Sequence, residues 1–153
     1  MNALPEANDI RGYYFKDLSV GMTDSYAKAI NKTNSVLFAG ISGHVNPIQL
    51  NEEFPTETML EVSIAHDMLT TSFISTVLGT ELPGHGCIYL RQDLHFFTPV
   101  RPSDPVHSQI TITDVNAKKI RVYADTVCRV GETSVVEEEA SLFVPNRRKA
   151  DAA

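Results

Sequence analysis

Residues 67–78, DMLTTSFISTVL, carry the clearest helical pattern in the sequence. Leu69, Phe73 and Val77 recur four residues apart, so they would lie on one face of a helix. Gly79 follows directly and is expected to end this helix, because glycine readily adopts the left-handed conformation found just after many helix C-termini. Serine and threonine give the stretch only a modest helix propensity, so we expect burial in the core to stabilise it.

Beyond residue 86 the apolar residues follow the two-residue alternation that is typical of strands. The first of these strands is expected to place four apolar side chains on one face: Ile88, Leu90, Leu94 and Phe96. Three more strands are predicted at roughly 106–115, 119–130 and 133–144, separated by turn sequences. Short links between consecutive strands imply that they pair antiparallel.

Before the central helix, the pattern predicts a strand at about 23–30 and a short helix that follows the capping residues 31–34. A turn-rich stretch then covers 43–58. One strand, short helices, a long helix and four strands do not alternate regularly, which indicates an α+β protein rather than a parallel α/β sheet. A curved antiparallel sheet wrapped around one central helix would bury the apolar faces of both.

The length and composition indicate one domain, which we place at 13–146, with loose termini at 1–12 and 147–153. Hydrophobic residues make up 42% of the chain, which is enough for a core. The net charge of −6 would repel a nucleic-acid backbone, so we do not expect nucleic acid as a partner. We find no signal peptide and no apolar run of transmembrane length, so we expect no membrane association.

The two cysteines, Cys87 and Cys128, lack metal-site spacing and favour a reduced, cytoplasmic protein with two small buried thiols. No ligand spacing supports a metal site at His44, His66 and Asp67, so none is expected. The sequence also contains no glycine-rich phosphate loop and no nucleophilic serine or cysteine motif.

Residues 42–51, SGHVNPIQLN, resemble the signature of the MaoC-like, (R)-specific enoyl-CoA hydratase family, which reads Ser-Gly-Asp-any-Asn-Pro-Ile/Leu-His. Residues 63–69, SIAHDML, resemble the Ile-Ala-His-Gly stretch of the same family. Further matches at 78–84 and 89–100 keep the family order, so the resemblance extends over most of the chain.

This resemblance implies a hot-dog fold, a homodimer and a cytoplasmic role in fatty-acid metabolism. It implies an acyl-CoA as substrate, with no separate cofactor. In such hydratases an Asp and a His hold a water. This water is added across the 2,3 double bond of an enoyl-CoA, or is removed from a 3-hydroxyacyl-CoA to form that double bond. The chemistry needs a base for the water, an acid for the α-carbon, and amide donors at a helix N-terminus for the thioester oxygen.

Three family positions are changed in this sequence. His44 stands where the family has Asp, Gln49 where it has His, and Asp67 where it has Gly. His44 is the candidate acid/base group, since histidine titrates near neutral pH. Gln49 can orient a water but cannot exchange its proton. These three residues are the candidate catalytic set, and losing one acid/base group costs on the order of 10²–10⁴ in rate.

Five further residues are candidates for binding the substrate. Asn46 is expected to shape the turn, and His66 to be structural or to line the pocket rather than to act in catalysis. The backbone N–H near Asp67 or Met68 would donate to the thioester oxygen. The remaining two, Gly84 and Gly86, would let the backbone approach a ligand closely.

Two alternative functions stay open. The first is a hot-dog acyl-CoA thioesterase, in which Asp67 acts as base or nucleophile on the thioester carbonyl. A carboxylate at this helix start is similar to the acidic residue of some hot-dog thioesterases and acyl-carrier-protein dehydratases, and it would form a dyad with His44. The alternative interpretation is that Asp67 has a purely structural role as the N-cap of the helix. The second alternative is a catalytically inactive paralogue that only binds acyl-CoA.

Overall fold

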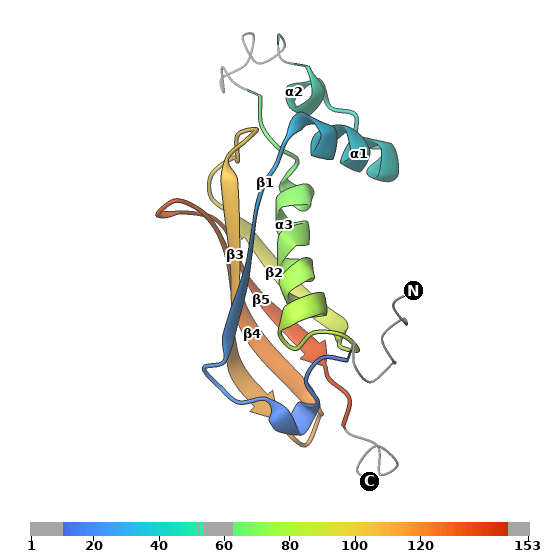
Figure 1. The fold of residues 1–153 in the computed structure, drawn as a ribbon, viewed down its shortest axis with the longest axis vertical. Coiled ribbons are helices and arrows are strands. Elements are labelled where there is room, and N and C mark those ends of the chain that lie inside the picture. The colour runs from blue at the N-terminus through green and yellow to red at the C-terminus, as the bar shows by residue number, and fades with distance from the viewer. Residues whose placement is uncertain (1–10, 52, 54–62, 147–153) are drawn as a thin grey trace, which may run out of the picture.

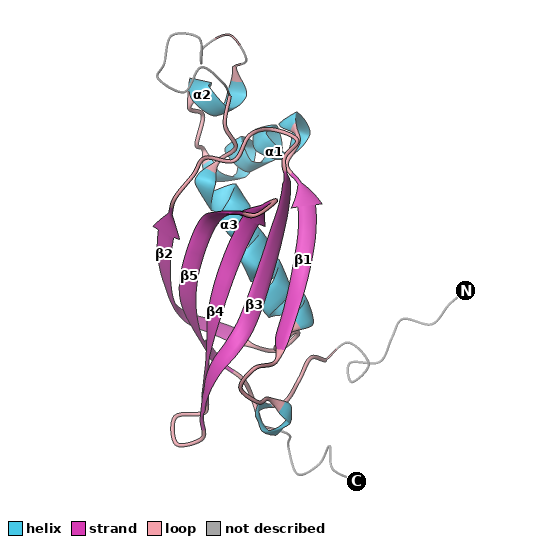
Figure 2. Ribbon diagram, turned by 90° about the vertical axis from the view of Figure 1, so that its left-hand side faces the viewer, coloured by secondary structure: helices cyan, strands magenta, loops and turns pink. Residues whose placement is uncertain are grey.

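The computed structural model describes residues 11–51, 53 and 63–146. A five-stranded antiparallel sheet curves around one helix, as Figures 1 and 2 show. The strands are β1 (Thr23–Ala29), β2 (Ile88–Phe96), β3 (Pro105–Asn116), β4 (Arg121–Val130) and β5 (Thr133–Phe143). Their order in the sheet is β1-β3-β4-β5-β2. The predicted α+β class, with an antiparallel sheet around a central helix, is confirmed.

The helices are η1 (Phe15–Asp17), α1 (Lys32–Ser42), α2 (Pro47–Leu50) and α3 (Asp67–Thr76), which is followed by a π-helical turn (Val77–Glu81). Asn31 caps α1, because its side chain accepts a hydrogen bond from the Asn34 N–H. In Figure 1, α1 and α2 lie together at the end of the sheet where α3 begins. None of the helices in these described ranges is long and apolar enough to cross a membrane.

The helix α3 is buried on the face that packs against β1, β3 and β4. Ile74 lies at the centre of this contact and is fully buried, as are Ile110 of β3 and Val122 of β4. Burial of large apolar side chains is what stabilises a helix of modest propensity. The α-helix ends at Thr76, and Gly79 lies within the π-helical turn that continues it rather than just after a helix C-terminus, which corrects the sequence prediction. The chain passes through the π-helical turn instead, since Val77 and Leu78 are themselves fully buried.

The edge strand β2 corrects two further expectations. It pairs with β5 and not with β3, because the link at 97–104 carries the chain across to the other side of the sheet. Tyr89 pairs with Leu142 while Arg91 pairs with Ser141, so one extra residue forms a β-bulge between them. The extra residue moves each side chain after the bulge to the face opposite the one that simple alternation predicts. The four apolar residues of β2 therefore do not share one face.

The N-terminal boundary of the packed region lies before residue 13. The Gly12 N–H donates to the His85 carbonyl over 3.1 Å. A Cβ atom at Gly12 would overlap the Pro83 carbonyl, so this contact requires glycine. Residues 1–10 and 147–153, which we expected to be loose, lie outside the described residues.

Candidate functional site

His44 is positioned by the end of α1. Gly43 ends this helix in the left-handed conformation, with a φ of 75°, and its N–H donates to the Ala39 carbonyl over 2.8 Å. The Ser42 hydroxyl accepts a hydrogen bond from the His44 N–H over 3.1 Å and donates to the Phe38 carbonyl over 2.7 Å. The His44 side chain is exposed directly after this turn.

Gln49 is held by the short helix α2. The Asn46 side chain caps this helix by accepting from the Ile48 N–H over 3.2 Å, and Pro47 occupies the first turn. Asn46 therefore shapes the turn as expected, while its contact with a substrate stays a prediction. The Gln49 Oε1 atom is buried and accepts no hydrogen bond.

His66 is fully buried at the N-cap position of α3. Its Nε2 lies 3.0 Å from the His44 carbonyl oxygen. A carbonyl can only accept, so Nε2 carries a proton, and in the neutral form of the ring Nδ1 is then the bare nitrogen. This Nδ1 is buried and has no hydrogen-bond partner. The ring packs between Phe38 and the ring of His44, each with a centroid separation of 5.0 Å.

Asp67 is the first residue of α3 and is exposed. It is not the N-cap that the sequence suggested, because His66 occupies that position. Asp67 and His44 are both described, yet they share neither a hydrogen bond nor an ion pair, and the His44 ring lies against His66 instead. No direct contact between His44 and Asp67 therefore supports the hypothesis that they form a dyad. Met68 follows with 54% of its side chain exposed.

The start of α3 thus gathers groups suited to holding a water and a carbonyl oxygen. The Ile48 carbonyl accepts a hydrogen bond from the Ile64 N–H over 3.3 Å, which places α2, and with it Gln49, near the start of α3. Gln49 Oε1 and His66 Nδ1 are both buried acceptors without a partner, and a water has two hydrogens to donate. The first N–H groups of a helix have no partner within the helix, which at α3 applies to Asp67 and Met68. Such donors stabilise negative charge on an oxygen.

Gly84 and Gly86 do not join this cluster within one chain. They follow the π-helical turn, at the opposite end of α3, and ten plus five helical residues correspond to about 22 Å. Gly84 has a φ of 81° and donates its N–H to the Leu78 carbonyl over 3.0 Å, so its glycine is needed for the local turn. Substrate contact by either glycine stays a prediction.

The structure reveals a second polar group that sequence reasoning missed. Glu138 of β5 is 6% exposed, and burial raises the pKa of its carboxyl to about 7. The Gln92 amide donates to Glu138 Oε2, whereas Glu138 Oε1 has no partner. The buried Tyr89 hydroxyl also has no hydrogen-bond partner. Burial, and then the charge of Glu138, raise the pKa of Tyr89.

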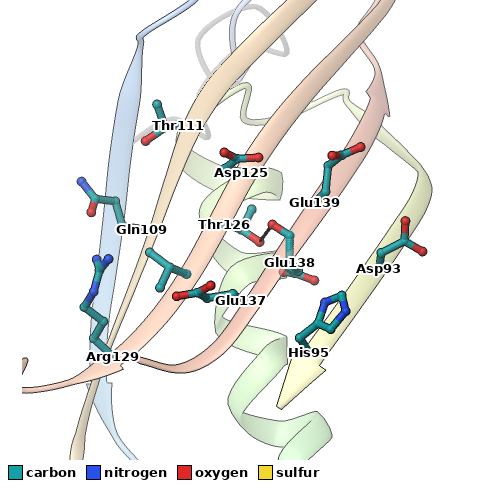
Figure 3. Close-up of a pocket in the computed structure, with 11 residues that line it drawn as sticks. Asp93, His95, Gln109, Thr111, Asp125, Thr126, Arg129, Glu137, Glu138 and Glu139 are labelled. Carbon is teal, nitrogen blue, oxygen red and sulfur yellow. Dashed lines mark hydrogen bonds between the residues drawn. The ribbon is translucent and has the colours of Figure 1, made fainter. Parts of the chain in front are cut away.

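A signal for this group was present in the sequence. Residues 137–139 are three consecutive glutamates in a strand with alternating burial, so at least one of them must face the core. The outer two lie on the opposite face of the sheet, beside a hollow of about 520 Å³ whose lining includes Asp93, Asp125 and the three glutamates together with polar and basic side chains (Figure 3). No group of three potential metal-binding side chains occurs within 11–51, 53 and 63–146.

Comparison with known proteins identifies the family of this chain. Residues 19–136 match the MaoC like domain. The chain is 43% identical over 141 residues to an (R)-specific enoyl-CoA hydratase of Rhodospirillum rubrum, which covers 92% of this chain and 98% of the relative. It is 40% identical over 148 residues to a 3-hydroxybutyryl-CoA dehydratase of Methylorubrum extorquens, which covers 97% and 92%. The (R)-hydratase from A. caviae involved in PHA biosynthesis superimposes with a TM-score of 0.83 at 33% identity, covering 85% of this chain and 99% of that one.

Proposed function

The chain belongs to the MaoC-like domain family, and we propose that it adds water to a 2-enoyl-CoA and removes it from the corresponding 3-hydroxyacyl-CoA. The observation that carries this proposal is the pair of buried, unpartnered acceptors at the start of α3, Gln49 Oε1 and His66 Nδ1. Relatives at 43% and 40% identity that are named as a hydratase and a dehydratase support the same reaction. The substrate supplies the CoA, and the proposal needs no other cofactor.

In the hydration direction, Gln49 Oε1 and His66 Nδ1 accept the two hydrogens of one water. The water oxygen bonds to carbon 3 while its proton passes to His66 Nδ1, and the electron pair of the double bond moves toward the thioester oxygen. The N–H groups at the start of α3 stabilise that oxygen. Carbon 2 then takes a proton from the histidines, which returns them to their starting protonation.

His44 and His66 share the acid/base work in this proposal. His66 is oriented by its bond to the His44 carbonyl, and this bond fixes the tautomer that has a bare Nδ1. The His44 ring is exposed and lies against His66, so it can exchange a proton with the substrate or with solvent. Gln49 orients the water without titrating.

One assay tests the reaction. The protein is incubated with crotonyl-CoA, and loss of the enoyl chromophore and release of free thiol are followed together. We expect the chromophore to disappear without thiol release. Thiol release would indicate a thioesterase that uses Asp67, and binding of the ester with neither signal would indicate an inactive paralogue. Either result would overturn the proposal.

We also propose that the protein is a homodimer that pairs through β2. This strand is the edge of the sheet opposite β1, so its outer backbone groups pair with no other strand in the part of the chain that the structure describes. Four large apolar side chains on or next to it are exposed: Ile88, Leu90, Phe96 and Phe97. Exposed apolar surface along a strand edge is typical of a protein interface. A second copy would also bring a Gly84 turn from another chain toward the β2 edge.

Sedimentation velocity tests the dimer. Leu90→Asp places a charge on the edge strand and is expected to shift the protein to monomers, while Val20→Asp, at an exposed apolar position away from β2, is the matched control. A monomeric wild type, or a Leu90→Asp variant that stays dimeric, would contradict this interface. We further propose a cytoplasmic location, which the two free cysteines support.

A further inference from the structure

The helix-facing side of the sheet has two unlike parts. The part that α3 packs against, formed by β1, β3 and β4, is mostly apolar, with Val106, Ile110 and Val122 fully buried beside the hydroxyls of Ser108 and Thr126. The part formed by β5 and the edge strand β2 lies beside α3 (Figures 1 and 2) and carries Glu138, Gln92 and Tyr89. Register pairs place these residues on the inner face: Glu138 pairs with Leu94, and Gln92 with Ala140.

This group is incompletely satisfied. Gln92 occupies one carboxyl oxygen of Glu138, and the other oxygen is buried with no partner. The Tyr89 hydroxyl, on the same face of the sheet, is also buried without a partner. Leaving a buried polar atom unpaired is unfavourable, and two such atoms on one face of β2 and β5 indicate that another polar group belongs there.

The group lies within reach of the reacting end of the molecule. The Thr70 carbonyl of α3 lies 3.9 Å from the Cys128 sulfur on β4. Cys128 pairs with Val136, and Glu138 is two residues further along β5, which is about 7 Å. Thr70 is three residues from the start of α3, or about 4.5 Å. The contact of Thr70 with Cys128 and the pairing of Cys128 with Val136 therefore connect the first turns of α3 to the part of β5 that carries Glu138.

We propose that Glu138 and Tyr89 bind a hydroxyl group at the far end of the acyl chain, so that the substrate class is a hydroxylated medium-length acyl-CoA. The inference rests on the proposed function for the position of the thioester. A hydroxyl donates to Glu138 Oε1 and accepts from the Tyr89 hydroxyl, which satisfies both atoms. A terminal methyl would leave both unpaired, and a terminal carboxylate would place a second negative charge beside Glu138.

Calorimetric binding of saturated thioesters, which undergo no hydration, tests the site. Hexanoyl-CoA and 6-hydroxyhexanoyl-CoA are titrated into the wild type, Glu138→Leu and Glu137→Leu. Glu137 is the matched control, because it is the neighbouring glutamate on the opposite face of β5. We expect the wild type and Glu137→Leu to bind the hydroxylated ester at least about tenfold more tightly, and Glu138→Leu to lose this preference. Tyr89→Phe, which removes only the hydroxyl oxygen, should reduce it severalfold.

Equal binding of the two esters by the wild type would overturn the inference. An unchanged preference in Glu138→Leu, or no binding of either ester, would do the same. A Glu138→Leu variant that changes only the oligomeric state, and not the preference, would assign the two atoms to the subunit interface and would also overturn it. Because binding is measured without turnover, failure here is distinct from failure to hydrate crotonyl-CoA.

Discussion

Two regions of the molecule hold buried polar atoms without partners, and they differ in how they are built. Within the described residues these atoms are Gln49 Oε1 and His66 Nδ1 at the start of α3, and Tyr89 Oη and Glu138 Oε1 between β2 and β5. The first pair comes from a short helix and a helix cap, where irregular backbone leaves polar side chains free to meet a ligand. The second pair lies on a regular sheet, where neighbours normally satisfy one another.

This difference indicates that the two regions have separate functions. At the start of α3, unpartnered acceptors lie beside free helix N–H groups, which is an arrangement for reaction. Between β2 and β5 there is a carboxyl and a phenol but no helix terminus, which is an arrangement for recognition. Changes at the first region should therefore alter rate, and changes at the second should alter selectivity and pH-dependent stability.

The largest expected effect is at the reactive region. His66→Ala removes the bare Nδ1 that takes the proton from water, so kcat/KM for crotonyl-CoA hydration should fall on the order of 10²–10⁴-fold. Steady-state kinetics measure this, with circular dichroism to confirm folding. His44→Ala should cost less, since its carbonyl still orients His66 in the variant. A folded His66→Ala variant with wild-type activity would contradict the assignment.

Glu138 should give the next largest effect, on stability. Burial raises its pKa from the ordinary 4.5 to about 7, so between these pH values the unfolded chain releases a proton that the folded chain keeps. Stability is then highest below about pH 4.5 and falls as the pH rises to about 7, by on the order of 2–3 kcal/mol.

Denaturant unfolding of the wild type and Glu138→Gln across this range measures the effect. The variant has no titrating group at this position, so the difference in unfolding free energy between the two proteins should shift in favour of the variant with rising pH. A difference that stays constant from pH 4.5 to 7 would mean that Glu138 is not buried as described.

The family arrangement can be restored at the reactive region. The double variant His44→Asp with Gln49→His returns a titrating pair, and we expect a gain of about tenfold in hydration rate. The same crotonyl-CoA assay detects it. A folded variant that binds the ester with no gain would mean that Asp67, or the position of the His66 ring, prevents the restored pair from acting.

The smallest effect is expected at Asp67. Its carboxylate interacts favourably with the start of α3 but opposes negative charge on the thioester oxygen. Asp67→Gly should therefore raise kcat severalfold and lower the unfolding free energy by about 1 kcal/mol. Kinetics and denaturant unfolding on one preparation measure both, and a fall in kcat would favour a catalytic role for the carboxylate.

Much of the fold was predictable because it depends on local periodicity. The apolar row of α3 and the alternation of β3 to β5 follow from elementary packing, and both were correctly predicted. The bulge in β2 was not, since one extra residue at Leu90 leaves no mark in composition but reverses every later side chain. Gly79 was misjudged because tertiary burial of its neighbours, rather than local propensity, decides where the helix ends.

The reactive site was predictable only where a motif marked it. His44 and Gln49 were named from the sequence as catalytic candidates and His66 as a structural or pocket-lining residue, and the structure brings His44 and His66 into contact. The bond that fixes the His66 tautomer spans residues 22 positions apart and could not be predicted locally. Glu138 was missed because a glutamate in a strand is normally assigned to the solvent face, and here three in a row forced one inward.

The division between a reactive and a recognising region is tested most directly by one set of kcat/KM values. Hydration of 2-hexenoyl-CoA and 6-hydroxy-2-hexenoyl-CoA is measured for the wild type, His66→Ala and Glu138→Leu. We expect His66→Ala to lower both values by the same factor, and Glu138→Leu to lower the value for the hydroxylated substrate alone. A His66→Ala variant that changes the ratio of the two values, or a Glu138→Leu variant that leaves it unchanged, would contradict the account.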